Sequence, residues 1–269
     1  NNNGVIAIDM DENKEYVILG KGVGFGKKVS QRFDKPEGCT TYRLEQETER
    51  GSAKELVKGI EPEYLEIADA ILTESQKVFG DSIDRGILFP LADHISFAVA
   101  RIRRNEQISN PLTEDIKVLF YSEFKVAETL KTILRERLQI EIDDHEVGYV
   151  ALHIHSAIGD EKVSVAMQTA RAVRECIDMI EKATGKPIDV LSLSYNRLMN
   201  HMKYMVARAS TGEKLNLDMN EYMLDQYPQA YKVATDICKN LEGCIGHNLD
   251  ETETGYLAMH IQRVYKDAV

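Results

Sequence analysis

The chain has 269 residues, of which 43% are hydrophobic and 29% are charged, a composition typical of a soluble globular protein. It contains no run of about 18 apolar residues, which excludes a transmembrane helix, and no secretory signal peptide is visible. The four cysteines form no CxxC pair, which argues against a zinc ribbon and indicates the reducing cytoplasm.

The net charge of −11 argues against a protein coated in a basic, nucleic-acid-binding surface. Residues 1–50 hold 8 Lys and Arg against 9 Asp and Glu, whereas the whole chain holds 33 against 44. Nearly all of the acidic excess therefore lies beyond residue 50. We expect any surface that binds a polyanion to lie in the first fifty residues.

Short strands separated by turns are predicted within residues 1–45. The segments with strand-like patterns are GVIAI (4–8), EYVILG (15–20), KKVSQRF (27–33) and TTYRL (40–44), with turns at DENK (11–14) and PEG (36–38). About four such strands form a small antiparallel sheet or barrel. A unit of this size seldom supports an independent core, so we expect it to dimerise.

From about residue 54 the apolar residues recur at helical spacing. The clearest examples are Leu65, Ala68, Ile71 and Leu72, followed by Ile95, Val99 and Ile102. The remainder is rich in helix-forming residues and predicts all-α structure. The expected fold class is multidomain, with a small antiparallel all-β N-terminal domain followed by all-α helical bundle domains.

Three blocks of the helical part occur twice. DHISFAVAR (93–101), FKVAETL (124–130) and EVGYVALHI (146–154) match NHMKYMVAR (200–208), YKVATDI (231–237) and ETGYLAMHI (253–261). All three pairs share one offset of 107 residues, which is also the separation of His94 from His201. A helical module of domain size is therefore duplicated.

The duplication retains four of the seven histidines. His94 and His153 of the first copy are 59 residues apart, as are His201 and His260 of the second copy. The other three have no counterpart at the same offset, since His145, His155 and His247 align with Thr252, Gln262 and Ile140.

A retained histidine at the edge of an apolar helix face has several interpretations. It can be a partly buried structural residue with hydrogen-bonded nitrogens, and that interpretation stays open. A metal site is disfavoured, because His153 and His155 point about 200° apart on a helix and Gln262 replaces the second of them in the other copy.

Phosphorylation is the remaining interpretation, because neutral imidazole is nucleophilic near pH 7. Arg101 and Arg208 each follow the first histidine of their copy by seven residues, two helical turns along the same face. They are candidate phosphate partners, and a solvated helix surface is the alternative.

The glycine run GKGVGFGKK (20–28) matches neither a dinucleotide fingerprint nor a P-loop, because residues other than glycine, serine or threonine occupy the required positions. In a strand, its alternating glycines would leave one face bare and place Lys21, Val23, Phe25 and Lys27 on the other. Lysines beside an exposed aromatic ring suit RNA. A flexible glycine turn with solvated lysines is the alternative.

The opening NNNGVIAI, the KGVGFGKK block and the duplicated DHI and LHI histidines resemble the BglG-type transcription antiterminators over essentially the whole chain. Such proteins have a co-antiterminator RNA-binding domain followed by two PTS regulation domains, here expected at residues 1–50, 54–162 and 163–269. Within the family, KGVGFGKK and ALHIHSA (151–157) are most similar to the glucose-type member.

The resemblance implies a cytoplasmic, homodimeric RNA-binding regulator that is not an enzyme and uses no cofactor or metal. It would bind a leader-mRNA hairpin in a sugar-transport operon and prevent an overlapping terminator from forming. The residues that fall where the family contacts RNA are Asn3, Gly20, Lys21 and Phe25. Family members usually carry further residues before NNN, including a lysine near the RNA, so we expect a trimmed start and reduced RNA affinity.

The resemblance also implies phosphorylation by the sugar phosphotransferase system. In the family, a sugar-specific enzyme II generally inhibits through the first regulation domain, and the phosphocarrier HPr activates many members through the second. We expect each copy to expose its two imidazoles where their charge controls subunit pairing. The residues implied are His94, His153, His201 and His260.

Two other functional classes are weaker alternatives. A PTS-regulated DNA-binding activator needs a helix-turn-helix, and the only non-duplicated segment has a β-type pattern. An enzyme such as a phosphohistidine phosphatase or a metal hydrolase needs a hydrolytic constellation beyond the histidines. The sequence offers neither a GxSxG motif nor a metal-ligand cluster.

Overall fold

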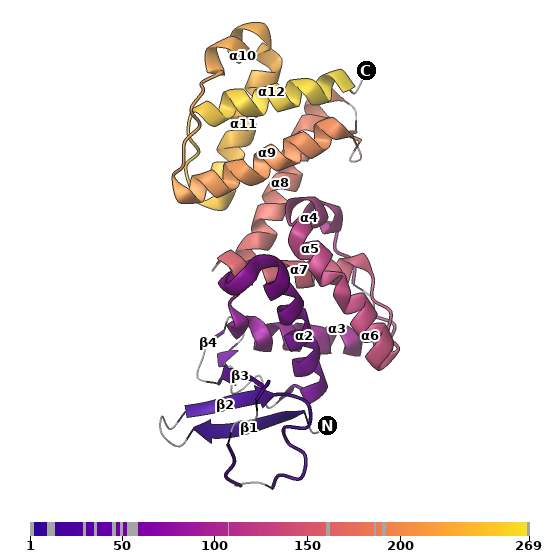
Figure 1. The fold of residues 1–269 in the computed structure, drawn as a ribbon. Coiled ribbons are helices and arrows are strands. Elements are labelled where there is room, and N and C mark those ends of the chain that lie inside the picture. The colour runs from indigo at the N-terminus through magenta and orange to yellow at the C-terminus, as the bar shows by residue number, and fades with distance from the viewer. Residues whose placement is uncertain are drawn as a thin grey trace. The chain divides into compact units, whose positions relative to one another are not determined.

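Two compact units make up the protein. The computed structural model describes residues 3–9, 14–28, 31–34, 37–44, 47–48, 51–52, 59–106, 108–159, 162–185, 187–189 and 192–267. Unit 1 comprises residues 1–110 and 122–161, and unit 2 comprises residues 111–121 and 162–269. The elements of each unit are labelled in Figure 1.

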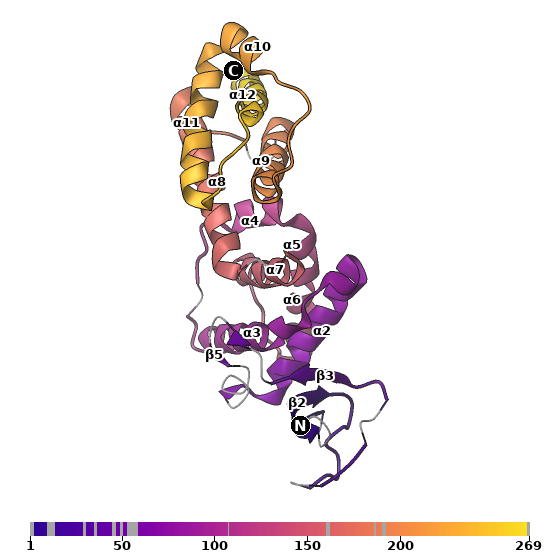
Figure 2. The ribbon, with the colours of Figure 1, turned by 90° about the vertical axis from the view of Figure 1, so that its left-hand side faces the viewer.

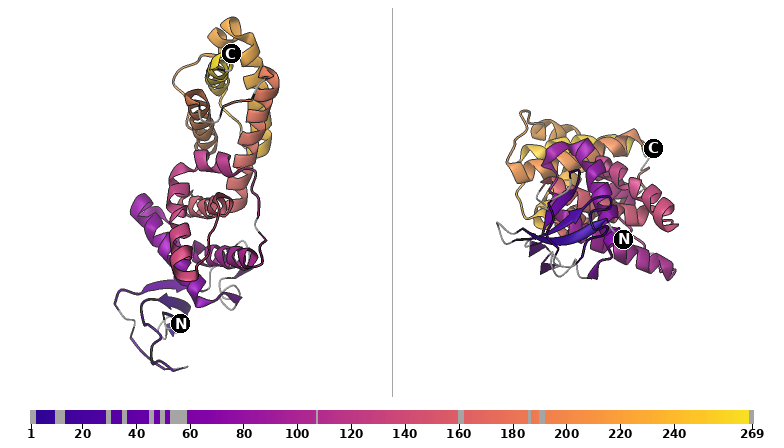
Figure 3. Two further views of the ribbon diagram at one scale, coloured as in Figure 1. Left: turned by 90° about the vertical axis from the view of Figure 1, so that its right-hand side faces the viewer. Right: turned by 60° about the horizontal axis from the view of Figure 1, so that its bottom comes forward.

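Unit 1 begins with a three-stranded antiparallel sheet in the order β1-β2-β3 (Figures 1 and 3). The strands are β1 (Gly4–Asp9), β2 (Lys14–Leu19) and β3 (Thr40–Arg43), with a separate two-residue pair β4 (Glu47–Thr48) and β5 (Gly51–Ser52). Val17 is paired with Ile6 on one side and with Tyr42 on the other, and Val17 and Tyr42 are buried. Three of the predicted strands are thus confirmed.

The predicted strand at 27–33 and the strand interpretation of the glycine run are wrong. No strand is present at residues 20–28 or 31–33, which are described. Consecutive turns occupy the glycine run, in which the amides of Val23, Phe25 and Lys27 each donate to the carbonyl oxygen three residues earlier. These turns bury Val23, which is 3% exposed, and leave Phe25 77% exposed, so the two side chains do not share a face.

The helical part of unit 1 packs around a dry apolar core. Its helices are α2 (Pro62–Phe79), α3 (Leu88–Arg103), α5 (Tyr121–Ala127, from residue 122), α6 (Thr129–Leu138) and α7 (Asp144–Gly159), with short 3₁₀ turns η1 (Gly80–Ser82) and η2 (Arg85–Ile87). Ile71 and Leu72, which belong to the predicted apolar face of α2, are fully buried. α3 packs against α2 and α7, and β3 contacts η2.

Unit 2 is all-helical. Its helices are α4 (Thr113–Leu119), α8 (Val163–Thr184), α9 (Leu193–Thr211), α10 (Asn220–Gln226), α11 (Pro228–Ile245) and α12 (Thr252–Asp267). α8 packs against α11, and α9 packs against α12 (Figure 2). None of the helices within the described ranges is both long enough and apolar enough to cross a bilayer.

The duplication is visible in the element bounds. At the offset of 107 residues, α3 corresponds to α9, α4 to α10 and α7 to α12. One difference is that α5 and α6 of the first copy are separated at Glu128, whereas α11 runs without a break. Another is that α4 packs against α8 and α9 in unit 2, whereas its counterpart α10 packs against α11 and α12. The first copy and the second are therefore two examples of one helical module.

Candidate functional site

In the first copy, α3 and α7 bring the two retained histidines together. The ring centroids of His94 and His153 are 5.3 Å apart, and the ring of Tyr149 lies 5.7 Å from that of His94. His94 Nε2 lies 3.4 Å from Glu146 Oε2, and Arg101 Nη2 donates to Glu146 Oε1 at 2.8 Å. The 59-residue spacing therefore corresponds to a direct contact.

The second copy repeats this arrangement between α9 and α12. The rings of His201 and His260 stack at 4.9 Å, and Tyr256 stacks on His201 at 6.1 Å. His201 Nε2 lies 3.6 Å from Glu253 Oε2. Arg208 binds the same carboxylate through two hydrogen bonds, of 2.6 Å from Nε and 2.9 Å from Nη2.

Burial sets the charge of these groups. It lowers the pKa of His201 to about 3, with His260 and Arg208 adding to the effect, and the pKa of His260 to about 4. Burial raises the pKa of Glu146. The neighbouring His94 and Arg101 lower it by more, so the pKa of Glu146 falls below its ordinary value. The second copy thus presents two neutral imidazoles at pH 7.

The histidines are less exposed than the sequence led us to expect. His94 is 8% exposed and His153 is 6% exposed, and the side chain of His201 is 8% exposed. The physical reason is that each histidine pair lies where two helices pack, and each ring covers its partner. A phosphoryl donor therefore needs a local opening of this contact to reach them.

The two arginines predicted as phosphate partners are bound to carboxylates in this structure. Sequence reasoning missed Glu146 and Glu253, and it missed the tyrosines that flank the first histidines. The signal was present, because the glutamate and the tyrosine recur at the same offset inside EVGYVALHI and ETGYLAMHI. The site is therefore a repeated set of five residues rather than a pair of histidines.

The histidines without a counterpart lie elsewhere. His145 Nδ1 is 3.2 Å from the carbonyl oxygen of Asn110, His155 Nδ1 is 2.9 Å from Glu123 Oε1, and His247 is exposed. Across the residues described, no group of three or more His, Cys, Asp or Glu side chains is arranged to hold a metal ion.

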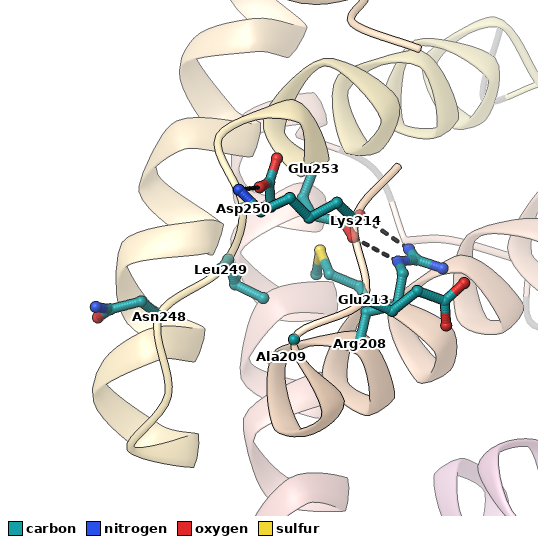
Figure 4. A pocket seen from close by; sticks show the side chains of 10 residues that line it. Arg208, Ala209, Glu213, Lys214, Asn248, Leu249, Asp250 and Glu253 are labelled. Atoms are coloured by element: carbon teal, nitrogen blue, oxygen red, sulfur yellow. Dashed lines mark hydrogen bonds and ion pairs between the residues drawn. The ribbon is translucent and has the colours of Figure 1, made fainter. Parts of the chain in front are cut away.

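A cavity of about 190 Å³ opens beside the arginine–glutamate pair of the second copy (Figure 4). Lys214 and Asp250, whose Nζ and Oδ2 atoms lie 3.2 Å apart, form part of its rim. Figure 4 shows Arg208 directed at Glu253, with dashed lines between the two side chains. Both residues line the cavity.

The four residues predicted to contact RNA gather around the turns at the end of β2. Asn3 accepts hydrogen bonds from the amides of Gly20 and Gly22, through its carbonyl oxygen at 2.9 Å and its Oδ1 at 2.8 Å. A Cβ at Gly20 would lie 2.3 Å from Cys39 Sγ and 3.2 Å from Cys39 Cβ, so a larger residue there requires Cys39 to move. Lys21 and Phe25 project into solvent from the same segment.

Comparison with known proteins identifies both parts of the chain. Residues 1–51 match the CAT RNA binding domain, and residues 69–157 and 174–264 match the PRD domain. The two PRD matches cover the duplicated helical modules, each with its histidine–glutamate–arginine set.

Similar proteins span the whole chain. The GlcA/glcB genes antiterminator of Staphylococcus carnosus is 30% identical over 267 residues, which cover 97% of this chain and 92% of that protein. Transcription antiterminator LicT of Bacillus subtilis is 26% identical over 271 residues, covering 99% and 98%. The crystal structure of GlcT CAT-PRDI is 28% identical, covers 59% of this chain and 94% of that one, and superposes with a TM-score of 0.51. The chain belongs to the family of transcription antiterminators, regulators rather than enzymes, that join a CAT RNA-binding domain to PRD domains.

Proposed function

We propose that the protein works as a homodimer in the cytoplasm, binds a hairpin in the leader mRNA of a sugar-transport operon and prevents terminator formation. Its activity depends on phosphorylation by HPr and by a sugar-specific enzyme II. The observation that carries this proposal is the same set of two histidines, a glutamate, an arginine and a tyrosine in both PRD copies, with the glutamate buried in each. The proposed phosphorylation sites are His94, His153, His201 and His260.

Neutral imidazole is the chemical form that phosphoryl transfer requires. Its unprotonated nitrogen attacks the phosphorus atom of the donor, whose own bond to phosphorus breaks, so the nitrogen must not already carry a proton. The low pKa values of His201 and His260 keep both rings in this form at pH 7. Burial therefore keeps each ring in the neutral, nucleophilic form and at the same time restricts the access of a phosphoryl donor to it.

The glutamate of each set couples phosphorylation to the packing of the two helices that carry the histidines. A phosphoryl group adds between about 1.5 and 2 negative charges, and on His94 it would face the Glu146 carboxylate across a buried contact. Arg101 already pairs with that carboxylate at 2.8 Å and lies on the same helix as His94. Phosphate and glutamate therefore compete for one guanidinium, and the packing of α3 against α7 cannot persist in its present form.

The RNA-binding role of Asn3, Gly20, Lys21 and Phe25 is supported by their grouping around one loop. Gly20, Lys21 and Phe25 lie on this loop, and Asn3, just before β1, binds two of its amides. An aromatic ring that is 77% exposed costs free energy unless something covers it, and a nucleotide base stacks on such a ring. Lys21 places a positive charge on the same loop, within a chain whose net charge is −11. The first fifty residues remain the part of the chain best suited to RNA.

The test uses the full chain and an RNA hairpin selected by the wild-type protein from a pool with randomised internal loops. Phosphorylated HPr and a phosphorylated enzyme II domain are supplied separately, and the modified histidines are mapped without acid. We expect His94→Asp, which places a negative charge opposite Glu146, to bind the hairpin about tenfold more weakly than His94→Ala. Adding Glu146→Gln to His94→Asp should recover part of this loss.

His247→Ala is the matched control, because His247 is exposed and belongs to neither histidine pair. Equal hairpin affinity and equal dimerisation in the His94→Asp and His94→Ala proteins would contradict inhibition through this residue. Phosphate found only on His145, His155 or His247 would contradict the assignment of the sites.

A further inference from the structure

The side chain of Asn3 joins the loop with the RNA-binding residues to the first helix of the PRD region. Its Oδ1 atom accepts from the amide of Gly22 at 2.8 Å, and its Nδ2 atom donates to Glu66 Oε2 on α2 at 3.2 Å. Glu66 also lies 3.7 Å from Arg137 on α6. A single amide group thus connects the RNA-binding loop with two helices of the regulatory domain.

The two partners of Asn3 impose one orientation on its amide. The Gly22 N–H group can only donate, so the oxygen of Asn3 must face it, and an ionised carboxylate can only accept, so the amide nitrogen must face Glu66. Aspartate at this position would set two carboxylates against each other, and alanine would bind neither partner. Gly22 has a φ of +69°, in the left-handed region that glycine adopts without strain, and in this turn its N–H group faces the Asn3 oxygen.

The polar side of α2 bonds to other elements of unit 1. Glu66, Asp69 and Gln76 lie at helical spacing on one side of α2 and form hydrogen bonds there. The buried positions and the C-cap glycines of α2 and α8 correspond at an offset of 105 residues, so the counterparts in α8 are Arg171, Arg174 and Glu181. Arg174 pairs with Glu181 inside its own helix, whereas the α2 residues bond outside theirs.

A second contact holds α2 in place against the sheet. The Tyr42 hydroxyl donates to Asp69 and accepts from Arg85 Nη2 at 2.7 Å, and Arg85 Nη2 also binds Asp69 at 2.6 Å. Tyr42 is buried on β3, and its ring contacts Phe89 of α3 edge-on at 6.2 Å. Because this cluster fixes α2 relative to β3, Glu66 keeps a fixed distance from Asn3.

We infer that Glu66 is a positioning residue of the RNA-binding site, although it lies outside the RNA-binding domain. It orients the Asn3 amide, and Asn3 in turn sets the shape of the Gly20–Lys27 loop. The first PRD domain therefore acts on the RNA-binding loop directly, through one hydrogen bond, in addition to any effect on dimerisation. The inference rests on the proposed RNA role of this loop.

The test compares Glu66→Ala, Glu66→Gln, Asn3→Asp and the double variant Asn3→Asp/Glu66→Gln in the full chain. Hydrogen exchange of the Gly22 amide is measured without RNA, and affinity is measured for the selected hairpin. Glu66→Ala should speed Gly22 exchange and weaken hairpin binding, each about tenfold, whereas Glu66→Gln should change little because its carbonyl oxygen still accepts from Asn3.

The double variant provides the rescue. The side-chain amide introduced by Glu66→Gln can donate to the carboxylate introduced by Asn3→Asp, so the two new groups can pair. Gly22 exchange should therefore return to within about threefold of the wild-type rate, well below that of Asn3→Asp alone. Glu74→Gln removes a carboxylate from the same helix that pairs only with Lys77 among the contacts described, and it should leave both measurements unchanged.

Two results would overturn the inference: wild-type Gly22 exchange in Glu66→Ala, or a double variant no better than Asn3→Asp. A failure of the proposed function looks different. In that case Lys21→Ala and Phe25→Ala would leave hairpin binding unchanged, while the exchange measurement would still decide the role of Glu66.

Discussion

Glu253 is 1% exposed, and Arg208 binds both of its oxygens. His201 lies 3.6 Å from the same carboxylate, yet burial and the nearby guanidinium keep its ring neutral. One buried cation thus satisfies one buried anion, and the histidine is left as an uncharged neighbour. At the scale of single residues, the positive and negative charges of the set compensate each other without phosphate. A phosphoryl group would add negative charge that is not compensated.

The buried histidines of the second copy should make unit 2 sensitive to acid. Their pKa values are about 3 and about 4 in the folded chain, against 6.5 in an unfolded one. Below pH 6.5 the unfolded chain therefore binds more protons, and the free energy of unfolding falls as the pH falls. Each histidine contributes up to about 1.4 kcal/mol per pH unit until its folded pKa is reached.

Urea denaturation from about pH 7 to about pH 5, followed through the amides of α9 and α12, measures this slope. His201→Gln removes one titrating group and should make the slope shallower, even though carboxylates such as Asp250 still titrate at lower pH. The same slope in both proteins would show that His201 is not held neutral by the fold.

The histidine pairs could be predicted from the sequence, but their burial could not. His94 and His201 stood out because two copies of one module can be compared within a single chain. Their burial depends on how α3 packs on α7 and α9 on α12, and that packing produces no periodic pattern at a polar residue. Glu146, the partner of Arg101, was missed although it recurs at the same offset as the histidines.

At the scale of elements, strands that depend on the local alternation of apolar residues were predicted correctly. Structure that depends on residues distant in the sequence was not. β1, β2 and β3 follow from alternating apolar residues between turns. The segment at 27–33 has the same alternation, yet its described residues, 27–28 and 31–33, form no strand. Its neighbouring loop is shaped by Asn3, some twenty positions earlier, which no local pattern reports.

The contact between α12 and the start of α10 depends on a glycine. A Cβ at Gly255 would lie 2.8 Å from the backbone nitrogen of Asn220 and 2.8 Å from the carbonyl carbon of Met219. Backbone atoms cannot turn away as a side chain does, so Gly255→Ala should lower the free energy of unfolding by roughly 1–3 kcal/mol. Chemical denaturation measures the change.

Gly243→Ala is the matched control for this prediction. Gly243 lies within α11, and a Cβ there would meet no atom within 4 Å. Alanine should therefore stabilise the helix by roughly 0.5–1 kcal/mol. A similar loss of stability in both variants would mean that the close approach of α12 to α10 is not the cause of the loss at Gly255.

At the scale of the whole molecule, the proposed dimer makes a prediction about β1. Ile6 and Ile8 alternate onto one face of this edge strand and are 60% and 55% exposed in the single chain. Replacing both with lysine costs a monomer little, because the side chains already face solvent, but it would disrupt an apolar interface with a second copy. Sedimentation analysis should show a shift toward monomer.

Val78→Lys is the control for the dimer prediction, since Val78 on α2 is 59% exposed and lies away from the sheet's edge strand. An unchanged monomer–dimer equilibrium in the double lysine variant would exclude β1 from the interface.

The position of α4 has a consequence for biosynthesis. This helix belongs to the first repeat by sequence, but it packs in unit 2 against α8 and α9, burying Ile116 and Leu119 and bonding Asp115 to the Tyr195 hydroxyl at 3.4 Å. On the ribosome, α4 emerges well before its partners, and its apolar face stays uncovered until they follow. A recombinant fragment that starts at α8 would lack this helix, so its hydrophobic core would be incomplete and prone to aggregate.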